Sequence, residues 1–196
     1  MLSEIENRRS IRKYKDKPVS KKDIEKIIHA GILAPSSKNR QPWKFIVVSG
    51  KSKEEMLSVM KKGIEREKKE PLLPESSHHI KAAEYTVNIM EQAPVTIFIV
   101  NALGLEIETQ ISPEQRVYEI CNAQSIGAAI QNMTLEATKL GLGSLWICDI
   151  YFAYKELKSW FDTDGELFAA LAVGYADEEP GARPRKSIKD IVKWNE

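Results

Sequence analysis

Apolar residues repeat at helical spacing in several stretches of the chain. The clearest is 20–34, where four isoleucines lie three or four residues apart behind a Ser20–Asp23 pair that resembles a capping box. Proline at position 35 disfavours helical angles in the residue before it, so the pattern predicts a helix that ends at Ala34. Similar patterns predict helices over 51–62, 76–92 and 153–161, and short ones over 2–7 and 188–194.

Three runs are almost continuously apolar, over 44–49, 95–100 and 168–175. Such runs are typical of strands covered on both faces of a sheet, and 144–148 also has strand character. Predicted helices and strands alternate without an internal repeat, which favours a mixed α/β or α+β layer structure. The highly charged segment 65–75 is predicted to be an exposed excursion, and 102–111 a loop.

The longest helical pattern covers 113–140 and has small residues at 125–129. Small residues let another helix backbone approach, so we expect a buried central or dimer-forming helix. Ser125, Gln131 and Asn132 are polar exceptions that need hydrogen-bond partners if they are buried. The glycine pair 141/143 follows a helix and lacks a third glycine, so it indicates a helix end more strongly than a dinucleotide-binding turn.

Size and composition favour one domain over 1–196, because 196 residues can share a single core and 42% of them are hydrophobic. The net charge of +1 gives no global field for nucleic acid or an anionic membrane, so we expect neither partner. The run 95–100 is far too short to cross a membrane, and 1–12 has no signal-peptide core. A cytoplasmic protein is therefore expected.

Motifs for covalent catalysis are absent from the sequence, which has no GxSxG and no Cys/His signature. Two cysteines and three histidines provide no plausible metal set, and the adjacent His78 and His79 fit a solvated helix start better than a metal site. We therefore expect no catalytic side chain and no metal. If the chain is an enzyme, its chemistry belongs to a cofactor.

Arginines gather near both ends of the chain. In 8–12, three arginines and a serine could grip one phosphate, although a solvated basic tail is the simpler interpretation of this segment alone. A second cluster near the C-terminus makes a shared anionic ligand more plausible, because one solvated face would not explain both. The candidate anion-binding residues are Arg8, Arg9, Ser10 and Arg12, with Arg183 and Arg185.

Four separated pieces together resemble the motifs of the nitroreductase family. They are RRSIR at 8–12, APSSKNRQPW at 34–43, LGLGSLWI at 140–147 and RPRK at 183–186. The first two are fairly specific, and the order of all four spans nearly the whole chain. The resemblance implies an α+β fold with a central, mostly antiparallel β-sheet flanked by helices, a long central helix, bound FMN and an intertwined homodimer.

Each motif then implies a place around the flavin. The residues of 8–12 and the pair Arg183 and Arg185 would hold the phosphate, the ribityl chain and the pyrimidine edge. The loop that reaches the flavin from the other subunit would be Pro35, Ser36, Ser37 and Asn39. The segment along the ring would be Leu145, Trp146 and Ile147, whose side chains could equally belong to a plain core strand.

The resemblance implies hydride transfer from NAD(P)H through FMN to an acceptor such as a nitroaromatic or a quinone. A flavin carrier or sensor without turnover, and a specialised flavin-dependent dehydrogenase, are the alternatives. Acceptor choice is expected to depend on 62–85 and 102–113. Many relatives have glycine or another small residue after the Trp-Ile pair, where this chain has Cys148 and Asp149. Asp149 could face the flavin or point away from it, and the outward direction is favoured.

Overall fold

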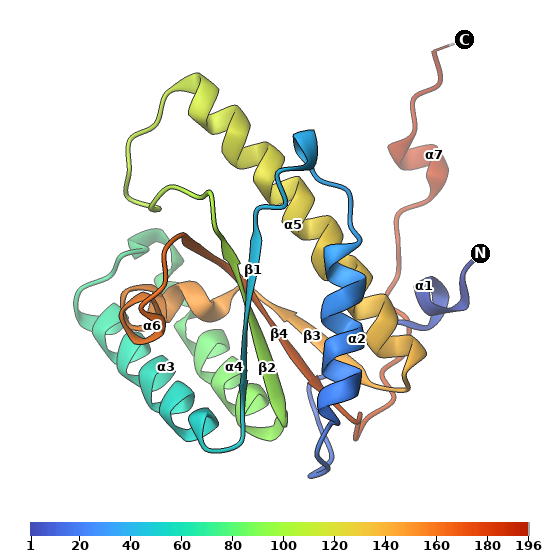
Figure 1. Ribbon diagram of the computed structural model, residues 1–196, viewed down its shortest axis with the longest axis horizontal. Helices are drawn as coiled ribbons and strands as arrows, with labels where there is room; N and C mark the ends of the chain where they lie inside the picture. The colour runs from blue at the N-terminus through green and yellow to red at the C-terminus, as the bar shows by residue number, and fades with distance from the viewer. Residues whose placement is uncertain (196) are drawn as a thin grey trace.

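A four-stranded antiparallel sheet forms the centre of the computed structural model, which describes residues 1–195 (Figure 1). The strands lie in the order β1-β2-β4-β3. Their bounds are Trp43–Ser49 for β1, Val95–Asn101 for β2, Gly143–Ile147 for β3 and Glu166–Gly174 for β4. The predicted antiparallel sheet flanked by helices is confirmed.

Strand β2 is buried along its whole length, as its apolar run predicts. Strand β1 is different, because it lies at the edge of the sheet and its Val47 is 43% exposed. The expectation that β1 is covered on both faces is therefore wrong. An apolar run reports strand propensity but does not distinguish an edge from a centre.

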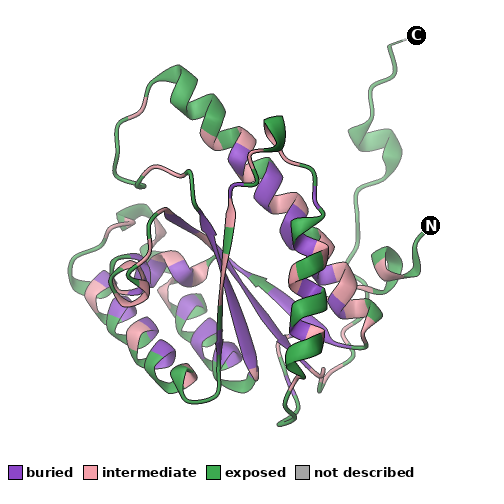
Figure 2. Cartoon of the chain, viewed as in Figure 1, coloured by how far each residue is buried: buried purple, intermediate pink, exposed green. Residues whose placement is uncertain are grey.

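Helices cover both faces of the sheet (Figures 1 and 2). On one face α2 (Lys21–Ile32) packs against α5 (Pro113–Lys139), and these helices share a core with Ile97 and Ile99 of β2. On the other face lie α3 (Ser52–Lys69), α4 (Ile80–Gln92) and α6 (Tyr154–Phe161), whose core includes Phe98 and Val100. Successive β2 residues thus alternate between two cores.

Helix α2 has the predicted cap, because the Ser20 hydroxyl accepts the Asp23 backbone N–H. The helix ends two residues earlier than predicted, at Ile32.

Helix α5 is 27 residues long and begins with a capping box between Ser112 and Gln115. Its buried residues begin at Asn122 and continue along one side of the second half, but Val117 and Ile120 in the first turns are exposed, contrary to the predicted apolar face. The Ser125 hydroxyl donates to the Cys121 carbonyl at 2.7 Å, and the Asn132 amide donates to the Ala30 carbonyl at 3.1 Å. Gln131 is exposed, and its Oε1 accepts a hydrogen bond from the Thr134 hydroxyl at 3.3 Å, so all three polar exceptions have protein partners.

Helix α3 extends seven residues beyond its predicted end, into the segment expected to be exposed. Glu67 is buried there, its carboxylate paired with Arg66 and accepting the Leu73 backbone N–H at 2.7 Å. Arg66 also pairs with Glu156 of α6 at 3.0 Å. The prediction of an exposed 65–75 is therefore wrong for Arg66 and Glu67, because their ion pairs let them pack against the neighbouring elements, whereas Glu65 and 68–71 are exposed as predicted.

Short 3₁₀ segments connect the larger elements: η1 (Ser37–Asn39), η2 (Pro74–His79) and η3 (Asp149–Ala153). The chain begins with α1 (Ser3–Asn7) and ends with an exposed arm that carries α7 (Ile188–Ile191) and stands away from the body in Figure 1. Within the described residues, none of the helices is long and apolar enough to span a bilayer.

Candidate functional site

The arginine-bearing segment 8–12 is fixed against the open edge of strand β3. Ser10 forms a parallel bridge with Ser144, and the Ile11 backbone N–H donates to the Ser144 carbonyl at 3.0 Å. The buried Ile11 side chain lies so close to Gly143 that a Cβ there would be 2.7 Å from Ile11 Cγ1. Gly143 is therefore required for this approach, which explains the second glycine of the motif. Gly141, with φ of 73°, ends α5 as predicted.

Tyr14 anchors the other end of this segment. Its ring is buried and its hydroxyl donates to the Ile11 carbonyl at 2.9 Å. Burial, followed by the nearby Glu178 carboxylate, raises the pKa of the Tyr14 phenol, so it stays neutral. The segment therefore has a fixed shape from Ile11 to Tyr14.

The C-terminal part of the chain returns to the same place. Backbone hydrogen bonds join Lys15 to Tyr175 and Asp177 to Lys13, each at 2.9 Å. The Glu178 carboxylate accepts the backbone N–H groups of Arg12 and Lys13. Glu178 was not predicted, because no local motif marks an acidic residue that binds backbone amides from the opposite end of the chain.

Both arginine clusters line one pocket of about 270 Å³, which we call the arginine pocket. Residues from the N-terminal segment form one side, and the C-terminal arm forms the other. Its polar lining consists of Arg8, Arg9, Ser10, Arg12, Arg183 and Arg185, with Glu6 as the one acidic residue. Segments about as far apart as this chain allows thus meet around one cavity.

The guanidiniums of the arginine pocket have no carboxylate within ion-pair distance among residues 1–195. Their hydrogen bonds go to backbone carbonyls instead, such as Arg9 to Glu6 at 2.7 Å, Arg12 to Ser10 at 3.2 Å and Arg185 to Pro184 at 3.2 Å. Each guanidinium has five donors, so most remain for a ligand. This arrangement suits a multiply charged anion such as a phosphate dianion.

Strand β3 continues from the arginine pocket with one edge open. Because backbone groups alternate along a strand, those of Trp146 face the same edge as the Ser144 carbonyl that binds Ile11. Leu145 and Ile147 are buried in the core, whereas Trp146 is 39% exposed. A flat ring placed along this edge would meet the backbone groups of Trp146 and its indole. Leu145 and Ile147 bury their side chains in the core and, by the same alternation, direct their backbone groups toward β4.

The loop 35–39 lies elsewhere in the same chain. Its Ser37 N–H donates to the Ser125 hydroxyl of α5 at 3.3 Å, and the Ser36 hydroxyl accepts the Gln41 N–H at 3.0 Å. Lys38 and Asn39 have positive φ of 54°, which fixes a tight turn. None of Pro35, Ser36, Ser37 and Asn39 lines the arginine pocket. One described chain therefore does not bring the two predicted halves of the site together.

Asp149 follows β3 and opens η3. Its carboxylate accepts a hydrogen bond from the buried Thr86 hydroxyl of α4. This contact fastens η3 to α4 and gives the charge a protein partner. The neighbouring residue Cys148 is exposed as a whole, but its thiol is partly buried. This partial burial, followed by the Asp149 charge, raises the pKa of the thiol.

Comparison with known proteins identifies similar chains over nearly the full length. A protein of Archaeoglobus fulgidus, named as a candidate NADH dehydrogenase/NAD(P)H nitroreductase, is 30% identical over 183 residues, covering 91% of this chain and 86% of its own.

Two solved structures have the same fold. A candidate nitroreductase from Desulfovibrio desulfuricans in complex with FMN is 26% identical with a TM-score of 0.73, covering 99% of this chain and 96% of that one. A BluB-like flavoprotein from Clostridium difficile is also 26% identical, with a TM-score of 0.70 and coverage of 99% and 98%. The model of the Nitroreductase family matches residues 5–175, which leaves Arg183 and Arg185 outside the match. The chain belongs to the nitroreductase family.

Proposed function

We propose that this chain is an FMN-dependent oxidoreductase. It takes hydride from NADH or NADPH and passes it to a small acceptor, such as a nitroaromatic compound or a quinone, in a ping-pong cycle. Bound FMN supplies the redox chemistry, and the protein binds and orients it. The observation that carries the proposal is the arginine pocket, where both chain ends direct unpaired guanidiniums to one cavity beside the open edge of β3.

The residues present fit FMN in two respects. The arginine pocket offers forked donors for the phosphate dianion, and the β3 edge next to it offers backbone groups and the Trp146 ring for the flavin. Among the structural relatives, the Desulfovibrio protein was solved with FMN. Solvent can reprotonate the reduced products, so no side chain has to act as a general acid.

We further propose a homodimer with shared sites. The loop 35–39 would then approach the flavin held by the arginine pocket of the partner subunit, since it does not reach the pocket of its own chain. The Ser37 hydroxyl forms no hydrogen bond within residues 1–195, while Ser36 is engaged by Gln41. Ser37 is thus the serine better placed to contact a ligand.

Purified protein and its spectrum test the redox proposal. We expect yellow protein, or protein that turns yellow with added FMN, whose flavin absorption is bleached by NADH or NADPH without oxygen and restored by a quinone. Protein that ignores FMN would contradict cofactor binding. Flavin that neither nucleotide bleaches would contradict the activity and favour a carrier.

Mixed dimers test the shared site. An Arg12→Ala chain and a Ser37→Ala chain each spoil a different half, so their heterodimer should contain one intact site. We expect each homodimer to bind FMN weakly and each heterodimer to recover one of its two sites, which is about a quarter of all sites in an equal mixture that exchanges at random. A mixture as poor as the two parents would show that each chain builds its own site.

A further inference from the structure

Asp149, two residues beyond the end of β3, has its hydrogen-bond partner on the side of the sheet that faces away from the Trp146 indole. Its carboxylate accepts the Thr86 hydroxyl of α4, and α4 shares the core that contains the buried β3 side chains. Trp146 points to the opposite face, where a Cβ on Gly127 of α5 would lie 3.7 Å from the indole. The Asp149 charge and the Trp146 ring therefore lie on opposite faces of the sheet.

The Thr86 hydroxyl is committed to this contact. Threonine hydroxyls in helices commonly bond to a carbonyl of the preceding turn, as Thr134 does to Gln131 at 2.8 Å and Thr138 to Thr134 at 2.9 Å in α5. Thr86 instead donates to Asp149, and the residue is only 6% exposed. A buried hydroxyl that bonds outside its own helix fixes the direction of its acceptor, because losing that acceptor leaves the hydroxyl unsatisfied.

Other contacts hold the segment that follows Asp149. Gly63 of α3 lies so close to η3 that a Cβ there would be 2.4 Å from the Ala153 Cα. The Tyr151 hydroxyl donates to the Phe168 carbonyl of β4 at 3.0 Å. The path of η3 therefore does not depend on Thr86. Removing the Thr86 hydroxyl changes the direction of one carboxylate and leaves the chain in place.

The solvent-facing side of Asp149 is the side of Cys148, which is exposed, whereas Ile150 is fully buried. By the alternation along β3, the Cys148 N–H points to the same open edge as the backbone groups of Trp146. A carboxylate released from Thr86 turns toward water, and thus toward the edge along which the flavin is proposed to lie. The Asp149 charge already acts on this side, since it is, after burial, the second cause of the raised pKa of the Cys148 thiol.

A negative charge beside a flavin disfavours its reduction, because reduction adds electrons to the ring. We propose that Thr86 is a positioning residue of the flavin site. By holding the Asp149 carboxylate on the α4 face, it keeps a negative charge away from the ring and so sets how readily bound FMN is reduced. This inference rests on the proposed function, since it requires FMN along β3. Thr86 itself touches neither cofactor nor substrate and acts through Asp149.

Equilibration of the FMN-loaded protein with a reference dye such as phenosafranine, without oxygen, measures the effect. Thr86→Val keeps the shape of the side chain but removes the hydroxyl, so the ratio of reduced to oxidised FMN at a fixed dye ratio should fall about fivefold or more. Thr86→Ser restores a hydroxyl and should return the ratio to that of the unaltered protein. If Thr86 served stability alone, the thermal unfolding of Thr86→Val would shift and the FMN ratio would not.

A double variant shows whether the effect passes through Asp149. Asp149→Asn keeps an acceptor for Thr86 and removes the charge, so by itself it should change the FMN ratio less than about twofold. Combined with Thr86→Val, it should recover the ratio that Thr86→Val lost. Thr134→Val is the control, because Thr134 is also buried and its hydroxyl bonds within its own helix. It should leave the FMN ratio unchanged.

Two outcomes would overturn the proposal. One is a Thr86→Val protein that keeps its FMN ratio. The other is an Asp149→Asn protein with Thr86 intact whose ratio changes about fivefold or more, since the charge would then already act on the ring. The second measurement does not use Thr86→Val, so damage to the fold by that variant does not prevent a decision. Unaltered protein that binds no FMN contradicts the proposed function and this inference with it, whereas bound FMN with an unresponsive ratio overturns this inference alone.

Discussion

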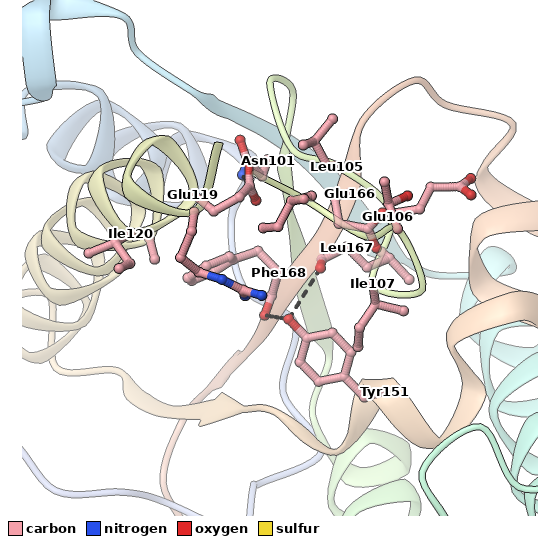
Figure 3. A pocket seen from close by; sticks show the side chains of 14 residues that line it. Asn101, Leu105, Glu106, Ile107, Glu119, Ile120, Tyr151, Glu166, Leu167 and Phe168 are labelled. Atoms are coloured by element: carbon pink, nitrogen blue, oxygen red, sulfur yellow. Dashed lines mark hydrogen bonds between the residues drawn. The ribbon is translucent and has the colours of Figure 1, made fainter. Parts of the chain in front are cut away.

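The arginine pocket contains five guanidiniums that form no ion pair within residues 1–195, and one carboxylate, Glu6. A pocket of about 320 Å³ between the first half of α5 and the loop 102–112 is lined by Glu106, Glu119 and Glu166 with Arg116, and we call it the carboxylate pocket (Figure 3). The neighbouring Lys158 pairs with both Glu106 and Glu166. The first therefore presents an excess of several positive charges and suits a multiply charged anion. The second contains mainly acidic side chains between apolar walls, and the neighbouring Lys158 already pairs two of them. The comparison shows that the charge a pocket presents to a ligand depends less on how many charged side chains line it than on how many of them the protein already pairs.

The largest effect should follow from removing guanidiniums from the arginine pocket. Arg8→Ala combined with Arg12→Ala removes two charged donors, and FMN affinity should fall about 100-fold or more, because each charge-assisted bond contributes about 1.5 kcal/mol or more. Flavin fluorescence titration measures it. Arg116→Ala, which removes a guanidinium from the carboxylate pocket instead, should leave FMN affinity unchanged. Equal losses in both variants would erase the distinction between the pockets.

A smaller effect is expected from disturbing the support of the arginine pocket. Gly143→Ala forces a Cβ against Ile11, which should cost about 1–3 kcal/mol of stability and weaken FMN binding as segment 8–12 shifts. The control is Gly127→Ala, whose Cβ would lie 3.7 Å from Trp146, an ordinary contact. Thermal unfolding and flavin titration of both variants decide the point. A stable Gly143→Ala protein with normal FMN affinity would show that the close approach is dispensable.

The smallest effect concerns two carboxylates of the carboxylate pocket, Glu119 and Glu166. The pKa of Glu119 is raised by burial and then by the Glu166 charge, with Leu105, Asn122 and Arg116 opposing. Glu166→Gln should therefore lower the Glu119 pKa toward its ordinary value. Carboxyl-carbon NMR measures the pKa.

The direction of the effect on the stability of the native state follows from the raised pKa of Glu119. A carboxyl whose pKa is raised on folding destabilises the native state once pH exceeds its unfolded pKa, so Glu166→Gln should reduce that cost. An unchanged Glu119 pKa would show that the two carboxylates do not interact, and Glu108→Gln provides the control.

The arginine pocket could be predicted from the sequence because its residues form short, recognisable strings. RRSIR at 8–12 carries three arginines and RPRK at 183–186 carries two, and the hypothesis of one shared anionic ligand linked the two clusters. The buried β2 and the cap of α2 were also predictable, since each depends on a pattern within a few residues. What the sequence could not provide was the contact between the chain ends, which depends on Glu178 and Tyr14.

The carboxylate pocket could not be predicted for the same physical reason. Asn101, Glu119 and Glu166 come from β2, α5 and β4, and in the sequence each resembles an ordinary surface residue. Glu67 was misjudged in the same way, because its burial depends on Arg66, which also pairs with Glu156 of a distant helix. Whether a charge is buried is decided by tertiary partners, which spacing alone does not reveal.

Comparing FMN with riboflavin tests the central claim most directly, because the two ligands differ only in the phosphate that the arginine pocket is proposed to hold. Fluorescence titrations of the unaltered protein should give about 100-fold or greater preference for FMN. The preference should fall, without vanishing, when Arg183 and Arg185, which lie outside the family match, are both replaced by alanine, because Arg8, Arg9 and Arg12 remain. Equal affinity for FMN and riboflavin in the unaltered protein would contradict the account.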